Sequence, residues 1–105
     1  MEPNAMLAAL RSVNDQLFDI WHATYIAEQS DAQLTFPDRR LQHETLAVLH
    51  AYLLQLSNSK RDLQERGMTN GLLYHTTVVY LDFWTYLTNQ LMAGYMNGQQ
   101  HYSTG

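Results

Sequence analysis

The fold is decided by residues 70–96, which read NGLLYHTTVVYLDFWTYLTNQLMAGYM. Between Met68 and Gly105 the only formally charged residue is Asp82. Apolar and aromatic side chains fill most of the other positions in this stretch. This pattern is typical of a helix that is covered on several sides.

Both strand and helix are considered for this stretch, because Thr76–Tyr80 are β-forming residues. The stretch is too long for one strand, and the absence of internal glycine or proline before Gly94 favours a helix. His75, Asp82 and Asn89 lie seven residues apart. That spacing turns a helix by only about 20° per step, so the three share one face. We predict a helix over about 70–96.

Two further helices are predicted upstream, over about 4–29 and about 37–66. In the first, Leu10, Val13 and Leu17 recur at steps of three and four, the spacing of an amphipathic helix. The apolar face of the second is predicted to consist of Leu41, Val48, Leu49, Tyr52, Leu53 and Leu56. Pro37 disfavours helix at the residue before it, and Gly67 is a natural C-cap.

The sequence therefore predicts an all-α fold, an antiparallel bundle of three long helices. We expect dimerisation to complete it into a larger helical bundle. A length of 105 residues fits one domain, assigned to residues 1–98. Asn97-Gly98 is a plausible helix stop, so residues 99–105 are predicted to form a flexible C-terminal tail.

Composition narrows the classes of partner. Charged residues make up 15% of the chain, against about 25% in a typical domain. The net charge is −4. The basic residues gather at Arg39-Arg40 and at Lys60, Arg61 and Arg66, and acidic residues lie beside both groups. No nucleic-acid partner is therefore expected. Cysteine is absent, which excludes disulfides and thiolate metal sites. The acidic start of the chain has no apolar run after it, and we expect a cytoplasmic protein.

The third helix, with Asp82 as its one charged residue, allows three interpretations: the centre of the bundle, an interface with another chain, or a membrane span. A membrane span is disfavoured because Asp82 alone costs about 2.5–3.5 kcal/mol at a bilayer centre. An interface is favoured because interface cores are rich in aromatic residues and Met and poor in charge. The predicted contact residues are Tyr74, Val78, Leu81, Trp84, Tyr86, Met92 and Tyr95.

His75, Asp82 and Asn89 are the polar candidates on this helix. If their face is buried, the carboxylate of Asp82 needs a donor, and the contact can fix a partner or a register. If their face is exposed, Asp82 points to water. The three residues are therefore candidates for a register contact or a ligand contact.

The five histidines are possible metal ligands. Asp19 and His22 share a helix face, but a metal site within a bundle needs such a half-motif on two helices. We therefore expect no catalytic residue, no metal and no cofactor. The predicted function is a non-enzymatic helical interaction module that acts as a homodimer or with a protein partner. The alternative is a bundle that binds a small molecule, cofactor or metal and possibly acts as a small enzyme.

Overall fold

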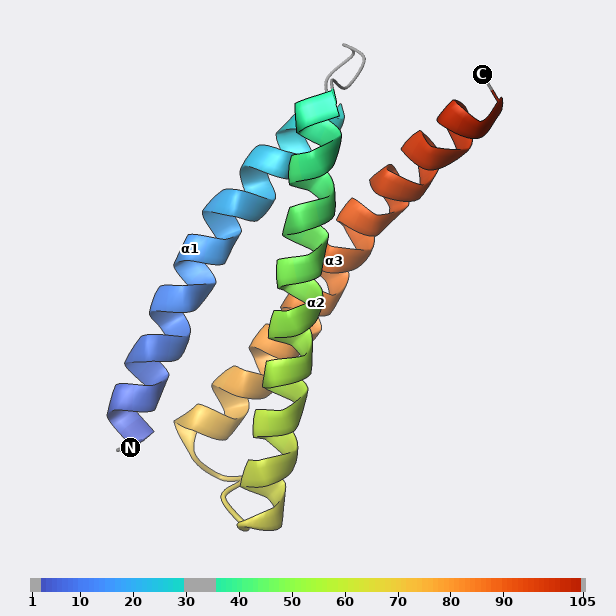
Figure 1. The fold of residues 1–105 in the computed structure, drawn as a ribbon. Helices are drawn as coiled ribbons and strands as arrows, with labels where there is room; N and C mark the ends of the chain where they lie inside the picture. The colour runs from blue at the N-terminus through green and yellow to red at the C-terminus, as the bar shows by residue number, and fades with distance from the viewer. Residues whose placement is uncertain (1–2, 30–35, 105) are drawn as a thin grey trace.

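The computed structural model describes residues 3–29 and 36–104, with side-chain surroundings for residues 4–29 and 36–96. The described chain forms three helices: α1 (Pro3–Gln29), α2 (Phe36–Glu65) and α3 (Leu72–Thr104) (Figure 1). No strand occurs within residues 3–29 and 36–104. The predicted all-α class is confirmed, and each helix packs against both others.

The C-terminus of α2 is closed by Gly67, the residue predicted to cap it. Gly67 has a φ of 71°, the left-handed conformation that glycine adopts without strain. Its N–H donates to the carbonyl of Gln64 at 3.1 Å, and the N–H of Met68 donates to the carbonyl of Leu63 at 2.8 Å. These two bonds form a Schellman motif, which satisfies carbonyls that the helix end leaves free.

The end of α3 differs from its prediction. The helix continues to Thr104, past the expected end near Met96 and through most of the segment expected to be a tail. Asn97-Gly98 predicts a stop, yet the backbone there is helical. Glycine inside a helix costs only about 1 kcal/mol relative to alanine, and no proline follows to force an end. Gly105 lies outside the described residues.

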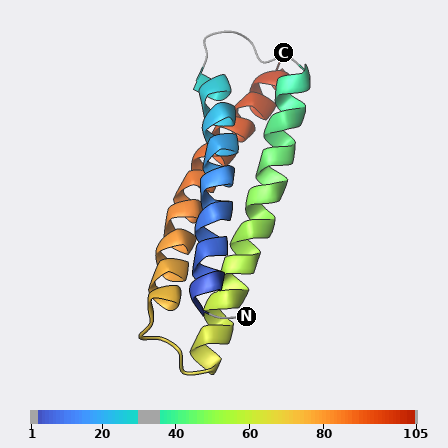
Figure 2. The same cartoon turned by 90° about the vertical axis from the view of Figure 1, so that its left-hand side faces the viewer.

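Contacts between the helices define their directions. Thr24 of α1 bonds to Thr45 of α2, and Glu28 farther along α1 bonds to Gln42 earlier in α2. Residue numbers therefore rise along α1 where they fall along α2. Figures 1 and 2 show α2 returning beside α1 and α3 then running in the direction of α1. The result is a rod with extents of 53 × 22 × 16 Å.

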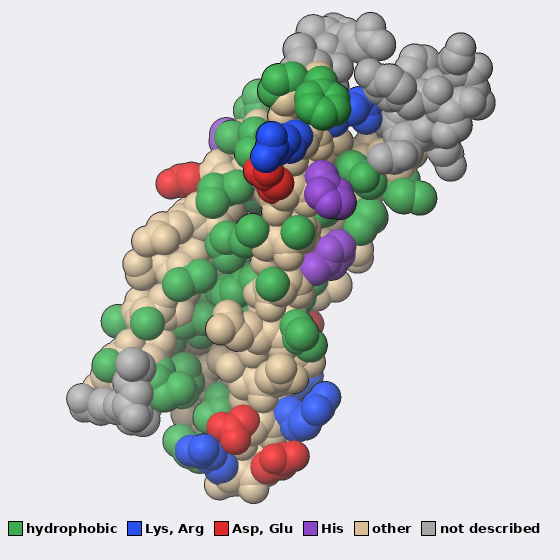
Figure 3. Space-filling view, viewed as in Figure 1, with side chains coloured by type: hydrophobic (Ala, Val, Ile, Leu, Met, Phe, Trp, Pro, Cys, Tyr) green, Lys and Arg blue, Asp and Glu red, His purple; other side chains and the backbone are tan. Residues whose placement is uncertain are grey.

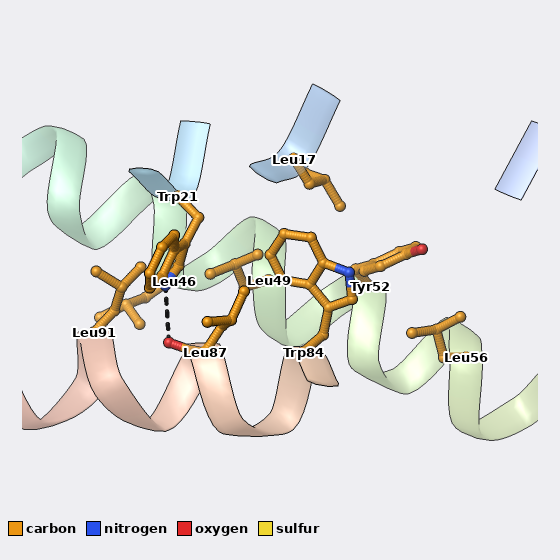
Figure 4. Close-up of a cluster of buried hydrophobic side chains, with 9 residues drawn as sticks. All are labelled: Leu17, Trp21, Leu46, Leu49, Tyr52, Leu56, Trp84, Leu87 and Leu91. Atoms are coloured by element: carbon orange, nitrogen blue, oxygen red, sulfur yellow. Dashed lines mark hydrogen bonds between the residues drawn. The ribbon is translucent and has the colours of Figure 1, made fainter. Parts of the chain in front are cut away.

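The core lies where α3 packs against the other two helices (Figure 4). Trp84 of α3 has no exposed surface, and its ring meets Tyr52 of α2 edge-on with centroids 5.9 Å apart. Its indole N–H donates to the side-chain oxygen of Asn14 in α1. Trp21 of α1 donates in turn to the carbonyl of Leu87 in α3 at 2.9 Å. Both buried indole N–H groups therefore have acceptors, as burial requires.

Replacing Trp84 by alanine is expected to cost about 3–5 kcal/mol, the usual loss for a buried aromatic residue. That is a large part of the roughly 5–15 kcal/mol that stabilises a domain. Urea unfolding followed by circular dichroism measures it. The matched control is Tyr86→Ala, two residues along the same helix and 62% exposed. It should change the free energy of unfolding by no more than about 0.5 kcal/mol. Equal losses at the two positions would contradict the assignment of the core.

Candidate interaction surface

Trp84 was predicted to contact a partner, but it lies wholly inside its own chain. The prediction is therefore wrong for this residue. The reason is its position on α3, where it reaches Asn14 of α1 and Tyr52 of α2 together. Two neighbouring helices are enough to cover the inner face of α3.

The other predicted contact residues divide into two groups. Tyr86 is 62% exposed. The rest are partly buried, and several already make contacts within the chain: Leu81, Met92 and Tyr95 pack against the core cluster. The amide of Gln64 donates to the hydroxyl of Tyr74 at 3.0 Å. The predicted set is therefore spread over the inner and lateral faces of α3, and Tyr86 alone of that set lies on the outer face.

A line of apolar side chains remains uncovered on the outer face of α3. Leu72, Val79 and Tyr86 are 61%, 60% and 62% exposed and lie seven residues apart. Phe83 lies between the last two and stacks on Phe18 of α1 with centroids 6.5 Å apart. We call Leu72, Val79, Phe83 and Tyr86 the outer α3 stripe. Aligned exposed apolar side chains are a candidate binding surface, whereas scattered single ones need no explanation.

The polar candidates lie beside this stripe. His75, Asp82 and Asn89 are all exposed. Each lies three residues after a member of the stripe, and Asp82 lies about one helical turn from both Val79 and Tyr86. The carboxylate of Asp82 faces solvent and needs no buried donor. These residues give the outer face of α3 a polar pattern beside its apolar line.

The sequence did not predict the polar contacts where α1 and α2 meet. The hydroxyls of Thr24 and Thr45 lie 3.1 Å apart and are hydrogen-bonded inside the bundle. One turn further, the amide of Gln42 donates to the carboxylate of Glu28, which also rests against Gly94 of α3. Burial raises the pKa of Glu28 above 4.5, and the Gln42 hydrogen bond opposes the rise. The signal for this cluster was the set of polar residues at core positions of both helices.

Three features bear on chemistry within the described residues: a buried tyrosine, the arrangement of potential metal ligands and a cavity between the helices. Tyr52 is buried, and burial, with the nearby Tyr80, raises its pKa to about 12, so the phenol stays neutral near pH 7. Within the described residues, no three His, Cys, Asp or Glu side chains come together as metal ligands would. A cavity of about 120 Å³ between the helices is lined largely by apolar residues such as Met6, Leu10 and Leu56. Its carboxylate, Asp62, is paired with Arg66.

Comparisons with known proteins identify no relative: no protein-family model matches the chain, and neither a curated protein nor a solved structure matches it. Among the described helices, none has the combination of length and hydropathy that crossing a bilayer requires.

The raised pKa of Glu28 predicts a pH-dependent stability difference. Between pH 4.5 and its folded-state pKa, the folded protein binds more protons at Glu28 than the unfolded chain does. The contribution of Glu28 to stability is therefore present at low pH and is lost as the pH rises through the folded-state pKa. Glu28→Gln removes this loss and keeps an acceptor for Gln42.

The melting temperature of Glu28→Gln minus that of the original protein should thus increase from pH 4 to pH 7 in thermal scans. Asp15→Asn is the matched control, because it removes one negative charge from an exposed site of α1. A difference for Glu28→Gln that shrinks as the pH rises would contradict the desolvated environment assigned to this carboxyl.

Proposed function

We propose that this chain is a non-enzymatic helical interaction module, an antiparallel three-helix bundle that binds another protein through the outer α3 stripe. The observation that carries the proposal is the exposure of Leu72, Val79 and Tyr86 by 60% or more at seven-residue spacing. The inner face of α3 is already packed, so this exposure is not required by the core. Covering each such side chain contributes roughly 1.5–3 kcal/mol.

The shape of the stripe favours an amphipathic helix as the partner element. Apolar residues at steps of seven, four and three are the anchors that a helix lying along another helix uses. Tyr86 and Phe83 supply aromatic surface, which is enriched among the residues that dominate binding energy. His75, Asp82 and Asn89, exposed along the same face, provide polar contacts that set the register of the partner.

The composition is compatible with this role. The chain has no cysteine, which is compatible with a reducing compartment, and we propose that it acts in the cytoplasm. A second copy of the chain and a different protein are both compatible with the proposal as partners.

The test compares the original protein with a Val79→Glu/Tyr86→Glu double variant as bait in the organism that makes it. A protein retained by the original bait is then purified and titrated against both by calorimetry. The double variant should bind at least tenfold more weakly, or about 1.4 kcal/mol. Both replaced side chains are exposed, so the fold should be retained, and circular dichroism checks this.

The matched control is Gln16→Glu/Ala23→Glu, which places two acidic residues at exposed positions of α1. It should bind like the original protein. Equal binding by the Val79/Tyr86 double variant and the original protein would exclude the outer α3 stripe as the contact surface.

A further inference from the structure

The exposed side of α2 carries a regular pattern of charge. The exposed residues on one side of this helix include Arg40, Glu44, Ala51, Leu54, Arg61 and Glu65, spaced at steps of three, four and seven. We call these six residues the α2 ridge. Arg40 and Glu44 also pair with each other at 3.1 Å. Between Glu44 and Lys60 the helix carries no formal charge, so the ridge has charged ends and an uncharged centre. Figure 3 shows the charged side chains gathered towards the two ends of this face, with apolar and neutral surface between them.

The two ends of the ridge have opposite charge order when they are read towards the centre. From the N-terminal end the order is Arg40 then Glu44, and from the C-terminal end it is Glu65 then Arg61. An identical helix laid along the ridge in the opposite direction therefore places Glu65 against Arg40 and Arg61 against Glu44. The same register places Leu54 against Ala51. A copy laid in the same direction places like charges together, which is unfavourable.

From this complementarity we infer that a second copy of the chain docks on the α2 ridge, with the two α2 helices antiparallel. The contact is related by a two-fold axis that passes between Ala51 and Leu54. Such an isologous contact uses each charge pair twice, because the same patch is contributed by both copies. The ridge spans about 38 Å of helix at 1.5 Å per residue, enough to fix the relative direction of the copies.

The centre of the ridge suits close packing. Ala51 has a small side chain, so it permits the axial separation of about 8–10 Å at which helices pack. Beside it, a groove of about 480 Å³ between α1 and α2 is lined entirely by uncharged residues, among them Val13, Val48 and Leu54. Val48 and Leu54 are 49% and 64% exposed. Apolar side chains of the second copy gain cover in this groove.

The exposed area of the chain agrees with such a contact. The chain exposes 7094 Å², whereas a monomer of 12.2 kDa typically exposes about 6,100 Å². A rod of 53 × 22 × 16 Å exposes more surface than a sphere of equal mass, and each partner in a standard interface buries roughly 800 Å². The α2 ridge shares no residue with the outer α3 stripe, so the proposed contact stands apart from the proposed function.

Sedimentation velocity from 1 to 100 µM tests the inference on the full chain. The original protein should show a species of twice 12.2 kDa at low salt. The dimer should weaken in high salt, because exposed charge pairs are screened. Glu44→Arg and Arg61→Glu should each raise the dissociation constant about tenfold or more, because each places like charges together at two symmetric sites. The double variant Glu44→Arg/Arg61→Glu should return to the original affinity.

Asp19→Arg is the matched control for Glu44→Arg. It changes the net charge equally, at an exposed position of α1. It should leave the dissociation constant unchanged. Circular dichroism of every variant establishes that the fold is retained, and the recovery in the double variant cannot arise from misfolding.

A strictly monomeric protein at 100 µM would overturn the inference. So would a dimer that is insensitive to the single charge changes or that does not recover in the double variant. The Val79→Glu/Tyr86→Glu variant separates the two surfaces, and its self-association should match that of the original protein. Loss of the dimer in that variant, with no effect of the charge changes, would place the second copy on the outer α3 stripe and overturn the α2 contact.

Discussion

The burial of Trp84 is the constraint on which the rest of the structure depends. Its ring meets Tyr52 of α2, and its N–H is bonded to Asn14 of α1, so one side chain of α3 positions both neighbouring helices. Trp21 of α1 provides the reciprocal bond to the backbone of α3 at Leu87. Apolar burial is non-directional and tolerates sliding along a helix axis. The two indole hydrogen bonds are directional, and they set the axial register that apolar packing leaves undetermined.

Much of the fold could be predicted because it is encoded locally. Apolar residues at steps of three and four placed α1 and α2, and Gly67 marked the end of α2 because few other residues adopt its φ without strain. The end of α3 was missed because Asn97-Gly98 permits a stop without requiring one. Trp84 was placed among the contact residues for a different reason. Trp84 and Tyr86 are both aromatic and two residues apart, so composition cannot say which is covered, and only packing against α1 and α2 decides it.

The structure also shows that exposed apolar surface is not limited to α3. The sequence suggested that unusual surface would be confined to the third helix, yet exposed apolar side chains occur on all three, including Ile26, Leu54 and Val79. The inner apolar face of α3 is buried in the core. The contact between α1 and α2 is the least extensive of the three helix contacts. A rod of three helices leaves each helix with an outer side. In this chain those outer sides carry apolar as well as charged side chains.

The positions of the charged residues on α2 show more than their spacing in the sequence does. In the sequence, Arg40–Glu44 and Arg61–Glu65 are ordinary pairs four residues apart, and such pairs are worth only about 0.3–0.5 kcal/mol within one helix. In the structure all four lie on one uncovered side of α2, with a charge-free centre between them. A dimer joined there carries two outer α3 stripes on one body. Two linked sites raise the effective affinity for a partner with two matching elements without any new contact. The two proposals are therefore compatible, because a contact on α2 leaves the outer α3 stripe open to a partner.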